Sequence, residues 1–141
     1  MALLNKTFLP NKKYENRTWF IIDCNDKKLG RLATIIVTLL KGKINSNYHS
    51  SIDIGHYVIL TNAKLIQTKK MNKQFLINKP GCPGRSLKIR KNETVSPKLI
   101  IKRSVKKMLP KNEAKKLIKR LYVYNNSIHK HQAQNPKIIN L

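Results

Sequence analysis

Apolar residues in the first half of the chain form two short continuous runs with a helical stripe between them. Residues 19–22 (WFII) and 57–60 (YVIL) are runs of four, which is typical of buried strands. Between these runs, apolar residues from Leu29 to Leu40 recur at the three- and four-residue spacing of one helix face. We expect Asp26 to cap this helix and Gly42 to end it. Strand, helix and strand in this order predict a βαβ unit with two parallel strands.

The middle of the chain has a weaker pattern. Residues 64–77 are strand-like but irregular: a basic turn at 69–73 separates the apolar pair 65–66 from the run 75–77. The stretch 80–85 (PGCPGR) is predicted to be a loop, because its prolines restrict φ and its glycines free it.

Two helices and a last strand are expected between residues 96 and 124. Ser96 followed by Pro97 is typical of a helix start, and Pro110 should end that helix. A second helix is predicted from about Asn112, because the apolar positions up to residue 121 keep the helical spacing. Residues 121–124 (LYVY) predict the final strand.

These elements indicate one α/β domain with basic extensions. We expect residues 1–17 to form an N-terminal arm, residues 18–126 the domain, and residues 127–141 a polar C-terminal tail. The 40% of apolar residues is enough for one core. No apolar stretch approaches the roughly 20 residues of a membrane-spanning helix, and the N-terminus lacks the apolar segment of a secretory leader. The sequence therefore predicts no membrane partner.

Charge is the most informative feature of the composition. The chain carries 30 Lys and Arg against 6 Asp and Glu, a net charge of +24 on 141 residues. The charge is uneven, with +5 on residues 1–60 and +19 on residues 61–141. A compact domain this basic repels itself unless it meets a polyanion, and a pI near 10.4 points to nucleic acid. Because 24 of the 30 cations are lysine, we expect contacts with phosphates and shape more than with base edges.

Catalysis, a metal site and a cofactor are not expected. The six acids form no spaced pair typical of acid–base chemistry, and no GxSxG, HExxH or GK[ST] motif is present. The turn at 23–30 is not glycine-rich, which argues against a dinucleotide site. Cys24 and Cys82 lie 58 residues apart with no CxxC pair, so a four-cysteine zinc site is excluded. We interpret Cys24 as a small buried apolar residue.

The candidate RNA contacts are the residues of the basic clusters, together with a few polar and aromatic neighbours. Ordinary solvated helices mix charge signs at i and i+4, and the predicted helices after residue 96 do not. Most aromatic residues lie in the apolar runs, and only Tyr48 is expected to be free to stack on a base. The candidates are Arg31, Lys41, Lys43, Tyr48, His49, Lys69, Lys70, Lys73, Arg85, Lys88, Arg90, Lys106, Lys107, Lys111, Lys115, Lys116, Arg120, His129 and His131.

Several motifs together resemble one family. They are Leu29-Gly30-Arg31-Leu32-Ala33 after a Trp-led strand, Asp53-x-Gly55-x-Tyr57-Val58-Ile59 followed by Asn62-Ala63, the loop Gly81-Cys82-Pro83-Gly84, the segment Val105 to Pro110 with the later Leu121 to Tyr124, and His129-x-His131-x-Ala133-Gln134-x-Pro136. In this order and spacing they are similar to the large-subunit ribosomal protein thirteen family. The chain departs from the family at His56, where aspartate is usual, and at residues 111–115, which replace a glycine-rich stretch.

The resemblance implies a three-layer α/β/α domain around a four-stranded, mostly parallel sheet. It also implies binding to large-subunit rRNA, a role in early subunit assembly, contacts with neighbouring large-subunit ribosomal proteins, and no homo-oligomer. Residues 5–10 are similar to the opening of plastid-encoded members from algae. Lys, Asn and Ile, which have A/T-rich codons, make up 56 of the 141 residues. Both features favour a plastid ribosome over the mitochondrial and bacterial alternatives.

Two other functions stay open at this point. An extraribosomal RNA-binding regulator would carry the same basic surface. A small RNA-processing enzyme would need a poised acid, base or metal that the sequence does not reveal.

Overall fold

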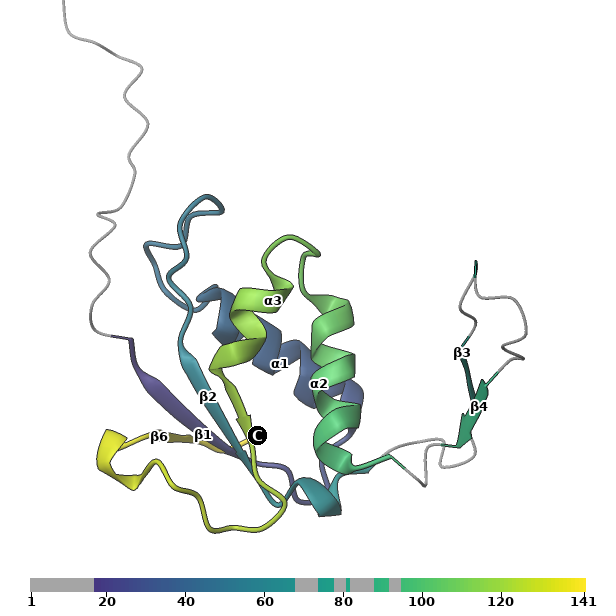
Figure 1. Cartoon of the computed structure of the whole chain (residues 1–141). Helices are drawn as coiled ribbons and strands as arrows, with labels where there is room; N and C mark the ends of the chain where they lie inside the picture. The colour runs from purple at the N-terminus through teal and green to yellow at the C-terminus, as the bar shows by residue number, and fades with distance from the viewer. Residues whose placement is uncertain (1–16, 68–73, 78–80, 82–87, 92–94) are drawn as a thin grey trace, which may run out of the picture.

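The computed structural model describes residues 17–67, 74–77, 81, 88–91 and 95–141 (Figure 1). Its centre is a four-stranded sheet in which β1 (Trp19–Asp23), β2 (Tyr57–Thr61), β5 (Leu121–Val123) and β6 (Lys137–Ile139) follow the order β5-β2-β1-β6. All neighbouring strands in this sheet are parallel. The expectation of an α/β domain with a mostly parallel four-stranded sheet is confirmed.

The predicted βαβ unit is present. Helix α1 (Leu29–Lys41) connects β1 to β2, and Ile21 lies beside Ile59 in the parallel register. As predicted, Gly42 ends the helix: it has φ of 72°, and its N–H donates to the carbonyl of Leu39 at 3.0 Å. The helix start differs from the prediction. Lys28 occupies the N-cap position without a side-chain cap, while Asp26 lies two residues earlier in a left-handed conformation.

The helices pack on one face of the sheet. Buried side chains of α1, α2 (Pro97–Met108) and α3 (Ala114–Leu117) share one core with Ile22, Val58 and Leu60. The chain crosses the sheet in one direction, from β1 to β2 to β5. It then returns past β2 and β1 to β6 at the opposite edge. Right-handed connections therefore place the helices on one face and residues 124–136 on the other. Figure 1 shows this return in yellow, and its regular structure is the short 3₁₀ helix η4 (Gln132–Gln134).

The second half departs from the predicted elements in three places. Residues 65–66 do not form a strand, because 3₁₀ helix η1 (Ala63–Leu65) follows β2 directly. The predicted helix through residue 121 is shorter: α3 spans four residues, 3₁₀ helix η3 (Ile118–Arg120) follows, and Leu121 begins β5. Strand β6 lies in the predicted polar tail, where the pattern gave no indication of it. Its side chains are mostly exposed, so pairing of its backbone with β1 defines it.

Two further strands form a separate antiparallel sheet outside the four-stranded sheet. Strands β3 (Gln74–Ile77) and β4 (Lys88–Lys91) pair with Phe75 opposite Arg90. This confirms the predicted strand at 75–77. The basic turn 69–73 and all of the loop 80–85 except Gly81 lie outside the described residues.

Candidate nucleic-acid interface

Lysines cover the exposed side of α2 and the segment that follows it. Lys106 and Lys107 are exposed in the last turn of α2, and Lys111 and Lys115 are exposed beyond it. Glu113 is the single acid in the sequence from 95 to 141. Because acids are nearly absent, these cations are not neutralised locally by the i, i+4 pairs of an ordinary solvated helix. The arrangement suits a polyanion.

A groove along the outer edge of the sheet brings together three lysines that the candidate set omits. Lys98 and Lys102 from α2 and Lys119 from η3 line it, and residues 121–125 form its floor. Its volume is about 350 Å³, and no acid lines it. We call these three lysines and the edge of β5 the lysine groove. The i, i+4 spacing of Lys98 and Lys102 is visible in the sequence, but their proximity to Lys119 depends on the turn from α2 into α3.

Arg120 is a correction to the candidate set. Its side chain is 8% exposed, and its guanidinium makes an ion pair with Asp53. Arg120 Nη1 also donates to Asp53 Oδ1 at 2.7 Å and to the carbonyl of Gly55 at 3.4 Å. These bonds fasten η3 to the loop before β2. Arg120, which the basic cluster suggested as a phosphate contact, is therefore one partner of an internal ion pair.

Asp53 is the acceptor at the centre of this junction. Arg17 lies 3.7 Å and Lys116 lies 3.2 Å from its Oδ2, and the Gly55 N–H donates to its Oδ1 at 3.3 Å. Burial alone would raise the pKa of Asp53. The bonds and charge of Arg120, with those from Lys116 and Gly55, outweigh burial and hold the pKa well below its usual range. Lys116 is 69% exposed, so its ammonium reaches both this carboxylate and the solvent.

His56 is buried beside this junction with both ring nitrogens occupied. Nδ1 lies 2.7 Å from Thr18 Oγ1, and Nε2 lies 3.1 Å from Asn45 Oδ1. Since the amide oxygen of Asn45 only accepts, Nε2 carries a proton, and in the neutral ring Nδ1 accepts from the Thr18 hydroxyl. Burial first, and the charges of Arg17 and Arg120 next, lower the pKa of His56.

Acidification from pH 7.5 to pH 5 is expected to lower the free energy of unfolding through His56. Its pKa is lowered in the folded chain, so its contribution is complete above the ordinary value of 6.5 and is lost as pH falls toward the folded value. Urea unfolding at both pH values checks this. The variant His56→Gln should show a smaller loss, whereas His49→Gln should keep the wild-type loss. An equal loss in His56→Gln contradicts the assignment.

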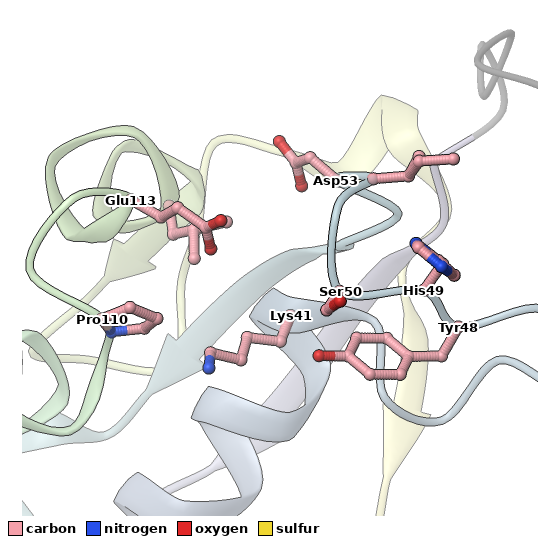
Figure 2. Close-up of a pocket in the computed structure, with 9 residues that line it drawn as sticks. Lys41, Tyr48, His49, Ser50, Asp53, Pro110 and Glu113 are labelled. Carbon is pink, nitrogen blue, oxygen red and sulfur yellow. The ribbon is translucent and has the colours of Figure 1, made fainter. Parts of the chain in front are cut away.

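A second hollow opens beside the loop after α1. It has a volume of about 190 Å³ and combines three segments: the end of α1, the loop before β2, and the turn into α3. Figure 2 shows its labelled side chains gathered around one space. We call it the Tyr48 cleft; it is lined by Lys41, Tyr48, His49, Ser50, Ile52, Asp53, Pro110, Glu113 and Leu117. Three candidates, Lys41, Tyr48 and His49, thus lie together.

The two C-terminal histidines lie on the sheet face opposite the helices. The His131 ring centroid is 4.4 Å from that of Tyr122 and 5.1 Å from that of Trp19. The Trp19 ring stacks on Tyr57 at 4.3 Å, and the His129 ring lies 6.3 Å from Tyr124. His131 therefore packs the returning chain onto the sheet, and the RNA contacts of both histidines stay predictions.

The remaining candidates are dispersed. Arg31 is exposed on α1 in a hollow of about 390 Å³ that it shares with Lys27, Lys28 and the C-terminal Leu141, and Lys43 is exposed after Gly42. Lys88 and Arg90 lie in β4, but the structure does not describe their side chains. Lys69, Lys70, Lys73 and Arg85 lie outside the described residues.

The surroundings of Cys24 and the grouping of possible metal ligands bear on other kinds of site. Cys24 is fully buried, as expected, and burial, with a smaller effect of Asp23, raises the pKa of its thiol to about 12. Within the described ranges, no three His, Cys, Asp or Glu residues are grouped in a way that could hold a metal ion. Among those same residues, no helix has both the length and the apolar composition that crossing a membrane requires.

Comparison with known proteins gives a consistent result over nearly the whole chain. The family model described as "Ribosomal protein L13" matches residues 17–130. The large ribosomal subunit protein uL13c of Trieres chinensis is 42% identical over 134 residues, covering 94% of this chain and 95% of that protein. The uL13 protein of Prochlorococcus marinus (strain MIT 9301) is 39% identical, covering 97% and 99%. That of Thermotoga petrophila is 41% identical, covering 98% and 96%.

Proposed function

The chain belongs to the ribosomal protein L13 family, and on that premise we propose that it is a structural constituent of the large ribosomal subunit that binds large-subunit rRNA. The observation that carries the proposal is the lysine groove, where three cations from two elements converge with no acid among the lining residues. The relatives named above are large-subunit ribosomal proteins, and the match to this chain covers almost their full length.

The domain and its cations have separate roles in this proposal. The buried residues of α1, α2 and the sheet form one core that serves as the scaffold. The lysines of the groove and of residues 106–116 project from that scaffold and contact phosphates. Lysine suits this role because its ammonium is a compact point charge that does not depend on base identity. Neighbouring ribosomal proteins are the other partners that family membership suggests.

Binding of rRNA should also stabilise the domain. A net charge of +24 repels itself in the free chain, and a polyanion relieves the repulsion. Any ligand that binds the folded state and not the unfolded state shifts the folding equilibrium toward the folded state. We therefore propose that the chain supports subunit assembly at an early stage. We assign it no catalytic role.

We place this function in a plastid ribosome. The similarity to uL13c of Trieres chinensis, the opening residues 5–10 and the abundance of Lys, Asn and Ile support this placement. A bacterial ribosome is the alternative, because relatives of similar identity are bacterial.

The experiment measures association with large subunits and its dependence on salt. The chain should sediment with purified large subunits, and recovery only at the top of the gradient would contradict the proposal. For isolated large-subunit rRNA, log K should fall linearly with log[salt]. The triple variant Lys98→Ala/Lys102→Ala/Lys119→Ala should flatten this slope by about two to three units, because each lost phosphate contact removes about 0.7–0.9. Lys64→Ala, outside the groove, should keep the wild-type slope. An unchanged slope in the triple variant would show that the lysine groove does not contact the rRNA.

A further inference from the structure

The Tyr48 cleft differs in chemistry from the lysine groove. It is lined by two carboxylates, Asp53 and Glu113, and a single lysine, whereas the lysine groove is lined by three lysines and no acid. Its volume of about 190 Å³ is below the roughly 300–1,000 Å³ of typical small-molecule pockets.

Tyr48 provides a stacking surface. Its residue is 38% exposed, and among the described residues its ring has no aromatic partner. Tyr57 and Tyr122, in contrast, stack on Trp19 within the domain. A tyrosine face without an aromatic partner is a common platform for an unstacked base, because every base has a π-face that can stack on it.

Glu113 provides a carboxylate with open acceptor sites. The two acids of the cleft differ, because Asp53 is engaged by Arg120, Arg17 and Lys116. Glu113 forms no ion pair with any residue that the structure describes, and Figure 2 shows its side chain directed toward the hollow. A carboxylate accepts two parallel hydrogen bonds through its two oxygens. Guanine has two adjacent donors on its Watson–Crick edge, N1–H and the 2-amino group. Adenine, cytosine and uracil each have one donor group there.

The charges around the cleft favour a nucleotide over a basic protein side chain. Lys41 lines the cleft, and Lys111 and Lys115 flank Glu113 in the sequence. These ammonium groups repel an arginine or lysine from a neighbouring protein, whereas they attract the phosphate of a nucleotide.

We propose that the Tyr48 cleft binds one unpaired guanine of the rRNA. The base stacks on Tyr48, its N1–H and 2-amino groups donate to Glu113, and Lys41 contacts its phosphate. The inference rests on the proposed function and adds a base-specific contact to an interface otherwise built on phosphates.

The test uses assembled large subunits that carry the chain or its variants. A reagent that modifies N1 and N2 of unpaired guanines is applied, and its sites are read by primer extension. In wild-type subunits, one guanine close to the chain should be protected. Glu113→Gln, which keeps the shape but loses the charge, should raise the reactivity of that guanine about tenfold, as expected for the loss of one bidentate contact. Tyr48→Ala should do the same, and Tyr48→Phe should keep the protection.

Asp26→Asn is the matched control, since it removes an exposed carboxylate outside the cleft. It should leave the reactivity of that guanine unchanged. Subunits that contain the variants but show no change at any guanine would overturn this inference alone. A crosslink from the cleft to a neighbouring protein would do the same and would assign the cleft to that protein. Absence of the wild-type chain from large subunits would instead overturn the proposed function.

Discussion

Replacing Gly55 with alanine is expected to destabilise the domain by about 3 kcal/mol. A Cβ at this position would lie 1.7 Å from the carbonyl oxygen of Leu40 and 2.9 Å from Arg120 Nη1. The first atom is backbone in the last turn of α1, so it cannot move without shifting the helix. The His56 N–H also donates to the carbonyl of Leu39 at 3.1 Å, which holds the two segments together. Overpacking of a fixed site commonly costs about 1–3 kcal/mol, and a backbone clash belongs at the upper end.

Urea unfolding of wild type and variant measures this loss. Gly30→Ala is the control, because no heavy atom lies within 4 Å of its added Cβ and the residue is helical. It should stabilise the chain by about 0.5 kcal/mol, since alanine favours a helix more than glycine does. If Gly55→Ala stays within about 0.5 kcal/mol of wild type, the contact between α1 and residue 55 is not a constraint on the fold.

Replacing Arg120 with alanine is expected to cost about 3 kcal/mol, because it removes the main partner of a partly buried carboxylate. Breaking a buried ion pair leaves one charge uncompensated, at a cost of about 3–5 kcal/mol. The lower end applies here, since the Asp53 side chain is 25% exposed and keeps Arg17 and Lys116. The control is Lys116→Ala at the same carboxylate. It should cost less than about 1 kcal/mol, because that lysine is 69% exposed.

The dependence of stability on pH identifies the ion pair as the cause. The pKa of Asp53 is lowered in the folded chain, so its contribution is present above the unfolded value near 3.8 and is lost as pH falls below it. Arg120→Ala should raise the folded pKa and weaken this acid-induced loss. If Arg120→Ala is destabilised but still loses as much free energy of unfolding at low pH as the wild type does, then lost packing, and not the ion pair, is the cause.

Arg120 is a residue whose structural role the charge pattern did not predict. Arg120 belongs to a dense basic cluster and was expected to contact phosphate, yet it is buried against Asp53, 67 residues earlier. Charge pattern gives the number of cations on a segment but not which of them turns inward. The inward turn follows from η3, a single 3₁₀ turn that carries Arg120 under the loop before β2. The sequence predicted a continuous helix there, because the apolar spacing continued into Leu121.

The candidate site also combines a residue that the sequence identified with residues that it did not. Tyr48 was identified as a free ring because it lies in a polar loop away from the apolar runs. Glu113, its neighbour in the cleft, carried no signal, since a single acid in a basic segment has no pattern. Lys98, Lys102 and Lys119 were also missing from the candidate set. Their groove forms only when α2 and η3 pack beside the edge strand β5.

Local sequence patterns were sufficient to predict the βαβ unit, the end of α1 at Gly42, the start of α2 at Ser96 and Pro97, and the basic character of the second half. Each of these depends on residues within a few positions of one another, where spacing, φ preference and local charge are decisive. Only the packing of distant elements shows that β6 completes the sheet, that Arg120 pairs with Asp53, and that two hollows of different chemistry form, one beside α3 and one between α2, η3 and β5. These features join residues far apart in the chain, and their formation depends on which elements pack together.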